Sequence, residues 1–147
     1  MDNNVIISIK GMQSLDGAEN ETVELVTEGT LIRDGDGEYT ISYQESEVTG
    51  MEGTLTTFQI ERGRVTLLRI GEFNSQMVFE QGRRHLSMYD TPYGALSVGV
   101  NTRRMRCRMG EHGGNIEIDY AIEIDHAVAG QNQFQIDVRE KRPALRQ

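Results

Sequence analysis

Hydrophobic and polar residues alternate with a period of two along most of this chain. The clearest run is I-E-I-D-Y-A-I-E-I-D, from Ile116 to Asp125, in which the isoleucines and the tyrosine share one face and the acidic residues share the other. Such alternation is typical of half-buried β-strands, and no segment shows the 3.6-residue apolar period of an amphipathic helix. The pattern therefore predicts an all-β protein.

Short turns separate the alternating runs, which favours an antiparallel meander. The ten predicted strands are Val5–Ile9, Thr22–Ile32, Tyr39–Tyr43, Thr54–Ile60, Val65–Ile70, Gln76–Phe79, Leu86–Tyr89, Leu96–Met109, Ile116–Asp125 and Phe134–Val138. Closing this meander into an up-and-down barrel would remove both sheet edges. At 147 residues the chain is predicted to form one domain, residues 1–147, whose charged end (138–147) frays.

The stretch T-P-Y-G, residues 91–94, predicts a hairpin turn, because a type I turn favours proline at its second position and glycine at its fourth. With Pro92, Tyr93 and Gly94 as a three-residue loop, Thr91 would pair with Ala95 and Asp90 with Leu96. This register would place the neighbouring apolar residues on one face, and Asp90 would then lie on the inner face.

A second hairpin is predicted to turn at Arg62-Gly63. It would pair Ile60 with Val65, Phe58 with Leu67, and Thr56 with Arg69, all on the inner face. A following loop over 72–74 would keep the next strand in phase, so that Met77 and Phe79 also point inward. Arg69 is therefore predicted to be an arginine on the core side of the sheet.

The segment R-R-M-R-C-R-M, residues 103–109, alternates arginines with Met105, Cys107 and Met109. Folding it back through 110–115 would set Arg108 opposite Glu117 and Arg106 opposite Asp119, with Cys107 inside as a small core residue. This pairing favours a neutralised outer ladder over a phosphate-binding patch. The apolar residues stand at even positions up to Val100 and at odd positions from Met105 onward. This change predicts a β-bulge near Thr102–Arg103.

Alternate loops of an up-and-down barrel gather at the same end, so several polar side chains are expected to meet at one mouth. Arg69, Asp90 and Thr56 should converge there, with Tyr93 and His126 on the rim. A buried charge is costly unless it is paired. Two interpretations follow: an Arg69–Asp90 pair closes the barrel end, or Arg69 holds an anion or a small polar ligand.

The distribution of charge excludes some classes of function. The net charge of -8 argues against a dedicated nucleic-acid binder. Residues 1–61 hold 13 acidic and 2 basic side chains, whereas residues 62–108 hold 9 basic and 3 acidic ones. The single cysteine excludes an internal disulfide, and neither a signal peptide nor a transmembrane run is evident. A cytoplasmic location is therefore expected, with no membrane partner.

The sequence contains no complete motif for a metal, a cofactor or catalysis. D-G-D-G-E-Y-T-I-S-Y-Q-E, residues 34–45, resembles a calcium loop, but Tyr39 stands where that loop needs glycine. The three histidines lack ligand spacing, and no nucleophile elbow, phosphate-binding loop or C-x-x-C motif occurs. We expect no metal, no cofactor and no enzymatic activity.

Four runs resemble the YwiB-like bacterial family. They are L-L-R-I-G (67–71), M-V-F-E-Q-G (77–82), M-Y-D-T-P-Y-G-A-L-S-V (88–98) and N-T-R-R-M (101–105). The resemblance extends over roughly residues 5–140 and is most specific at Y-D-T-P-Y-G. It implies a domain of unknown function with a calycin-like barrel, related in shape to lipocalins. It brings no activity, cofactor or catalytic residue, and a shared fold does not fix function.

The sequence favours a small intracellular protein that binds a polar or amphipathic ligand at the Arg69 mouth. The alternative is a protein-interaction module with a filled barrel, acting through its outer surface or as a homodimer. RNA binding through Arg83, Arg84, Arg103 and Arg104 would predict strong salt dependence.

Overall fold

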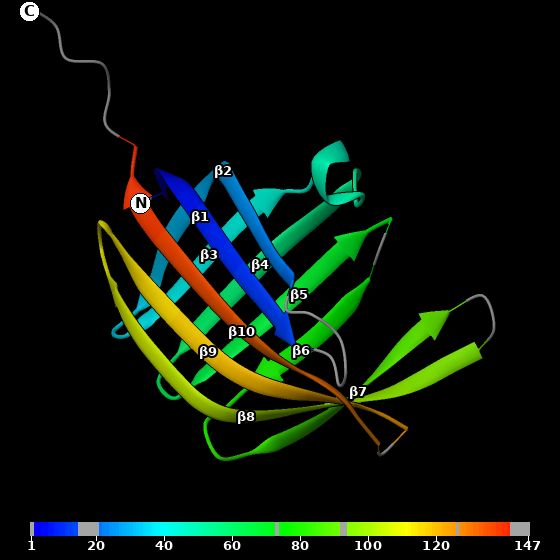
Figure 1. Ribbon diagram of the computed structural model, residues 1–147. Coiled ribbons are helices and arrows are strands. Elements are labelled where there is room, and N and C mark those ends of the chain that lie inside the picture. Colours follow the sequence, from blue (N-terminus) through cyan, green and yellow to red (C-terminus); the bar gives the residue numbers. More distant parts are fainter. Residues whose placement is uncertain (1, 15–20, 73, 92–93, 126, 142–147) are drawn as a thin grey trace, which may run out of the picture.

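Ten antiparallel strands form a single sheet in the computed structural model, which describes residues 2–14, 21–72, 74–91, 94–125 and 127–141. The strands are β1 (Asp2–Ser14), β2 (Glu21–Gly35), β3 (Glu38–Gln44), β4 (Thr54–Glu61), β5 (Arg64–Gly71), β6 (Ser75–Phe79), β7 (Arg84–Thr91), β8 (Gly94–Gly110), β9 (Gly113–Ile124) and β10 (Ala127–Glu140). One short 3-10 helix, η1 (Glu47–Thr49), follows β3 (Figure 1). The predicted all-β class is confirmed, and so is the number of strands.

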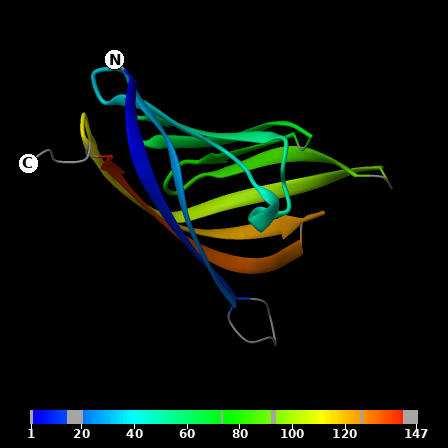
Figure 2. The ribbon, with the colours of Figure 1, turned by 90° about the horizontal axis from the view of Figure 1, so that it is seen from above.

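The strand order is β6-β5-β4-β3-β2-β1-β10-β9-β8-β7. Every neighbouring pair is consecutive in the sequence except β1 and β10, whose pairing joins the two ends of the chain. Figures 1 and 2 show that the sheet curls around until β6 approaches β7 and β8. This nearly closed up-and-down barrel is consistent with the calycin-like fold that the resemblance implied.

A bulge in β8 closes the barrel against the turn between β6 and β7. The register of β8 on β9 shifts between Thr102 and Arg104, which confirms the predicted bulge. Gly82 N–H donates to the Thr102 carbonyl at 2.9 Å, and Thr102 N–H donates to the Arg83 carbonyl at 3.1 Å. Met105 N–H donates to Gln81 Oε1 at 3.0 Å. The bulge thus directs backbone groups of β8 toward the β6–β7 turn, where they find hydrogen-bond partners.

Charged side chains reinforce this seam around Glu80. Its carboxylate lies 3.0 Å from His85 Nε2, 3.4 Å from Arg83 Nε and 3.5 Å from Arg64 Nε. The hydrogen bond with His85 is the main cause that lowers the pKa of Glu80, and the neighbouring arginines add to it. The ionised form of Glu80 therefore stabilises the folded barrel.

Glu80→Gln is expected to reduce stability at neutral pH, and the difference from the wild type should shrink in acid. A lowered folded-state pKa contributes stability above the unfolded-state pKa, and this is lost as pH falls through the folded-state value. Urea unfolding of both proteins across a pH series measures the difference. Glu117→Gln is the control, because Glu117 forms no ion pair with the described residues. A difference for Glu80→Gln that does not change with pH would contradict the electrostatic explanation.

Aromatic side chains fill the middle of the barrel. Phe58 and Phe79 are buried, and Phe79 makes an edge contact with Tyr120 at a centroid distance of 4.9 Å. Phe134 lies about equally far from all three rings, at 6.0 to 6.2 Å. The core around them contains the aliphatic residues Val5, Ile7, Leu31, Ile41, Ile60, Val65, Leu67, Val100, Ile116, Ile118, Ile136 and Val138. The centre of the barrel is therefore packed with side chains.

The β4–β5 hairpin has the predicted register, with Thr56 opposite Arg69, Phe58 opposite Leu67 and Ile60 opposite Val65. Gly63 adopts φ 76° in its turn, a conformation that glycine reaches without strain. The predicted inward placement of the β6 residues is also confirmed, since Phe79 is buried and Met77 packs against the core.

The β7–β8 hairpin differs from its prediction by one residue. Thr91 pairs with Gly94 and Asp90 with Ala95, so the connection has two residues rather than three. The inward residues Val98 and Val100 face Ser87 and His85, and Leu86 is 57% exposed. The predicted inner face of β7 is therefore wrong, because Gly94 takes part in strand pairing instead of the loop.

The β8–β9 hairpin differs by two residues. Arg106 lies opposite Glu117 and Arg104 opposite Asp119, because the glycines predicted as loop belong to the strands and Gly110 pairs with Gly113. Gly113 has φ 130°, and a Cβ there would lie 2.2 Å from the Val138 carbonyl oxygen. The close approach of β10 thus requires this glycine and tightens the turn.

Two smaller predictions are also corrected. Cys107 is exposed rather than part of the core, because this half of β8 lies beyond the seam and pairs, among the described residues, with β9 alone. Strand β10 continues to Glu140, so the end predicted at Val138 comes too early. Residues 142–147 lie outside the described part of the chain.

Candidate functional site

Two connecting segments meet at the mouth of the barrel. They are residues 45–53, between β3 and β4, and residues 72–74, between β5 and β6 (Figure 1). Glu72 N–H donates to the Gly53 carbonyl at 3.3 Å. Gly71 has φ 133°, and a Cβ there would lie 2.3 Å from the Gly53 carbonyl oxygen. A residue with a side chain at position 71 would therefore push the two segments apart.

A row of polar side chains crosses the inner face of three strands just inside this mouth. Tyr43 on β3 pairs with Thr56 on β4, and Thr56 pairs with Arg69 on β5. Glu45 follows two residues after Tyr43, immediately beyond the end of β3. Residues two apart in an extended chain point to the same side, so Glu45 joins this row.

The carboxylate of Glu45 is the centre of the cluster. Its side chain is fully buried, and its Oε2 accepts a hydrogen bond from the Thr56 hydroxyl. Arg69 Nε lies 3.9 Å from the same oxygen, close enough for an ion pair and too far for a hydrogen bond. Glu45 Oε1 and Arg69 Nε are both buried, and neither has a hydrogen-bond partner among the described residues. The mouth therefore holds a buried charge pair with hydrogen-bonding capacity left over.

Tyr43 completes the cluster as a neutral phenol. Burial is the main cause that raises the pKa of its phenol, and the negative charge of Glu45 raises it further. The positive charge of Arg69 acts in the opposite direction. The phenol therefore stays protonated beside the Glu45 carboxylate.

Arg69 is the accessible member of this group. Its side chain is 25% exposed, while the side chain of Glu45 has no exposed surface. Arginine carries five N–H donors in a planar fork that suits carboxylate and carbonyl acceptors. The arrangement can hold an acceptor group at the mouth. The described residues contain no group of three or more His, Cys, Asp or Glu side chains placed to hold a metal ion.

Comparison with known proteins places the chain in a family. A family model described as "Domain of unknown function (DUF1934)" matches residues 7–136. The chain belongs to this family. The crystal structure of the ywiB protein from Bacillus subtilis has the same fold, with a TM-score of 0.81 at 19% sequence identity, covering 96% of this chain and 94% of that chain. No curated protein matches the DUF1934 chain.

Of the residues predicted for the site of this DUF1934 protein, the structure brings Thr56 and Arg69 together. The carboxylate beside Arg69 is that of Glu45. Asp90 pairs with Ala95, so its predicted pairing with Leu96 is wrong, and its side chain lies outside the described part of the structure. Tyr93 and His126 lie outside the described residues.

Sequence reasoning missed Glu45 because it ended the strand at Tyr43 and considered this residue only as the last position of a calcium loop, which it rejected. The available signal was the alternation in Y-T-I-S-Y-Q-E, residues 39–45, which continues past the predicted strand end at Tyr43. The alternate side chains continue to point inward as far as Glu45, since the buried residues include Tyr39, Ile41, Tyr43 and Glu45.

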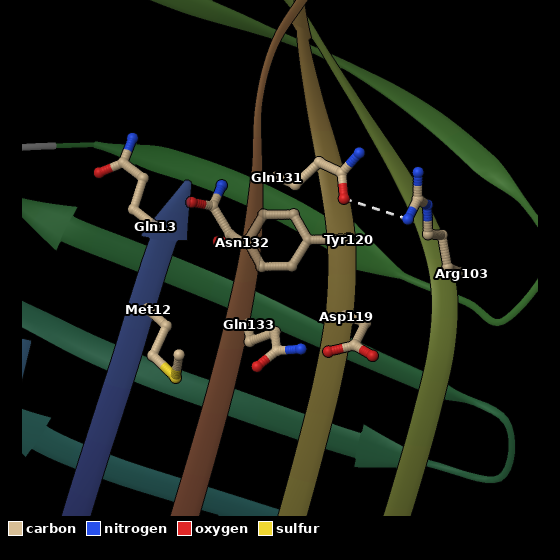
Figure 3. Close-up of a pocket in the computed structure, with 8 residues that line it drawn as sticks. All are labelled: Met12, Gln13, Arg103, Asp119, Tyr120, Gln131, Asn132 and Gln133. Carbon is tan, nitrogen blue, oxygen red and sulfur yellow. Dashed lines mark hydrogen bonds between the residues drawn. The ribbon is translucent and has the colours of Figure 1, made fainter. Parts of the chain in front are cut away.

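A second hollow lies against the long strands β1, β10, β9 and β8 (Figure 3). Its volume is about 190 Å³, and it adjoins a larger groove of about 510 Å³. Figure 3 shows Arg103, whose Nη1 donates to Gln131 Oε1 at 3.1 Å, together with Asp119 and Gln133. No residue predicted for the site lies here. The run Q-N-Q, residues 131–133, was instead taken partly as a turn, whereas β10 begins at Ala127.

The predicted outer ladder of opposite charges exists in a shifted form. Arg104 is paired in register with Asp119, and Arg106 with Glu117. None of these four side chains forms an ion pair within 4.0 Å with the described part of the chain. The acidic row beside the arginines still lowers the local positive potential, which makes this face less suited to a polyanion.

Within the described ranges, no helix has the length and apolar character needed to cross a bilayer.

Proposed function

We propose that this DUF1934 protein is a cytoplasmic, non-enzymatic binding protein that holds a small polar molecule at the mouth of its barrel. The proposal rests on the unused hydrogen-bonding capacity of the Arg69 guanidinium. A fully buried carboxylate holds this side chain at the mouth, but the guanidinium makes no hydrogen bond to the described residues. The N–H groups that reach solvent can donate to a carbonyl or carboxylate of a ligand.

Charges around the mouth narrow the class of ligand. Glu47, Glu52 and Glu72 are exposed on the two connecting segments, and Glu45 already balances the charge of Arg69. A polyphosphate would be repelled by this rim, whereas a neutral or zwitterionic molecule would not. The ligand we propose is therefore a small molecule with one acceptor group for Arg69 and no excess negative charge.

Native mass spectrometry of protein purified from its own host tests this proposal. We expect the wild type to retain a small molecule and Arg69→Met to lose it. Arg62→Met is the matched control, because Arg62 is 79% exposed in the turn that joins β4 to β5. Arg62→Met should retain the molecule. Urea unfolding confirms that each variant is folded.

Two outcomes would contradict the proposal. A wild-type protein that carries no small molecule in a stoichiometric amount would leave the cluster without a binding role. A molecule that Arg69→Met retains would show that Arg69 only closes the barrel end, together with Glu45.

A second candidate function is a protein-interaction module, which the filled barrel favours. Phe58, Phe79 and Phe134 occupy the centre, so a large apolar ligand would have to displace them. A module of this kind would bind its partner through the outside of the sheet.

A further inference from the structure

Among the described residues, one edge of strand β2 carries no partner over more than half of its length. Residues Glu21 to Gly29 pair with β1, while pairing with β3 begins only at Thr30. Among the described residues, nothing pairs with the other side of 21–29. In an antiparallel pair every second residue directs both its N–H and its C=O away from the partner strand. This half of β2 therefore presents a row of free backbone donors and acceptors.

A groove runs along this free edge where β2 separates from β3. Its volume is about 590 Å³, and it is lined by Thr27, Glu28, Gly29, Thr30, Ser42, Tyr43, Gln44 and Leu55. Gly29 marks the point of separation, because a Cβ there would lie 2.3 Å from the Ser42 carbonyl oxygen. The two strands are thus in close contact at Gly29 and leave space beyond it.

The free edge lacks three of the features that block strand addition. Proteins protect exposed edges with charged side chains, above all lysine, and with proline or a bulge, and the only charged residues here are Glu21, Glu24 and Glu28. Residues 21–29 contain no proline and no lysine, and their pairing with β1 has no register shift. The free part of β8 differs, because it carries the bulge after Thr102 and four arginines between residues 103 and 108. The edge of β2 is therefore open to a further strand.

Side chains along this edge define the chemistry of the strand that would fit. Glu24 and Glu28 lie on the outer side, with Val26 between them at 68% exposure. Glu24 lies 3.9 Å from Lys10 and Glu28 lies 2.7 Å from Lys141, both exposed ion pairs that basic residues of an added strand would have to share or replace. Leu25 and Thr27 lie on the inner side, where Leu25 packs against the core. The surrounding part of the chain, residues 1–61, has 13 acidic and 2 basic side chains. An added strand would place its alternate residues beside the glutamates and the apolar groove.

We infer that the edge of β2 at residues 21–29 binds an extended segment of another protein in which basic and apolar residues alternate. The segment adds a strand to the sheet, its backbone pairing with β2 and its basic side chains facing Glu24 and Glu28. This inference develops the second candidate function, and it does not depend on a ligand at Arg69.

A synthetic nine-residue peptide that alternates lysine and valine tests the inference by fluorescence anisotropy. We expect it to bind, and we expect a peptide of the same composition with its lysines and valines in two blocks to bind more weakly. Two N-methylated forms, methylated at odd or at even positions, separate strand pairing from charge attraction. Strand addition requires only one set of N–H groups, so one methylated form should lose binding and the other should keep it.

Protein variants locate the binding site. Val26→Lys should weaken binding of the alternating peptide by roughly fivefold, because it places a positive charge beside the basic residues. Val128→Lys is the matched control: Val128 is also 68% exposed, but it lies on β10, which β1 separates from β2. The peptide assay involves no ligand of the mouth. A wild-type protein that binds the alternating peptide but retains no small molecule in native mass spectrometry would support this inference and contradict the mouth proposal.

Three outcomes would overturn the inference. Equal binding of the alternating and block peptides would show attraction by charge alone. Equal weakening by Val26→Lys and Val128→Lys would place the contact elsewhere. A concentration-dependent dimer in sedimentation that Val26→Lys abolishes would show that the occupant of this edge is a second copy of the chain.

Discussion

Phe79→Ala is expected to lower the free energy of unfolding by about 3–5 kcal/mol, the usual cost of truncating a fully buried phenylalanine. The Phe79 ring is buried completely and contacts Tyr120 and Phe134. It belongs to β6, a strand of five residues that pairs within the described chain with β5 alone. Loss of the ring would therefore remove a main contact between the last strand of the sheet and the strands opposite.

Urea unfolding followed by circular dichroism measures this loss. Leu86→Ala is the control, because Leu86 is 57% exposed and its truncation should change stability by less than about 0.5 kcal/mol. Phe79→Leu should fall between the two, since it keeps part of the buried volume. A cost below about 1 kcal/mol for Phe79→Ala would mean that the barrel interior is not packed as described.

The success of the sequence predictions depended on how well local chemistry fixed the register. In the β4–β5 hairpin the turn R-G and the inward residues Phe58 and Leu67 agree on one solution, and the structure has it. In β7 apolar residues occur at both even and odd positions, such as Leu86 and Tyr89, so the sequence does not single out one apolar face. Alternation alone could not decide between two registers there, and the wrong one was favoured.

The same dependence explains the outcome at the mouth. The pairing of Thr56 with Arg69 was predicted correctly because both residues belong to the β4–β5 hairpin, whose register the sequence determines well. The partner of Arg69 depends on contacts between strands distant in the sequence, and the wrong β7–β8 register led to Asp90. Glu45 follows the end of β3, and the alternation over residues 39–45 indicates its inward direction but not that it meets Arg69. Its role depends on the tertiary placement of residues 45–53.

Glu45→Ala is expected to lower the free energy of unfolding by about 3 kcal/mol, because removing one partner of a buried ion pair leaves the other uncompensated. Arg69 would lose its counterion, and the Thr56 hydroxyl would lose its acceptor. Arg69→Met should cost a similar amount, since it would leave the fully buried carboxylate of Glu45 without a cation.

The double variant Glu45→Leu/Arg69→Met is expected to recover most of this loss, because apolar side chains of similar size often replace a buried ion pair without a net cost. A double-mutant cycle by urea unfolding measures the coupling between the two positions. Recovery would mean that the fold itself does not need the charges, which would then have to be explained by what Arg69 binds. A double variant as unstable as the single variants would instead make the pair a structural closure of the barrel end.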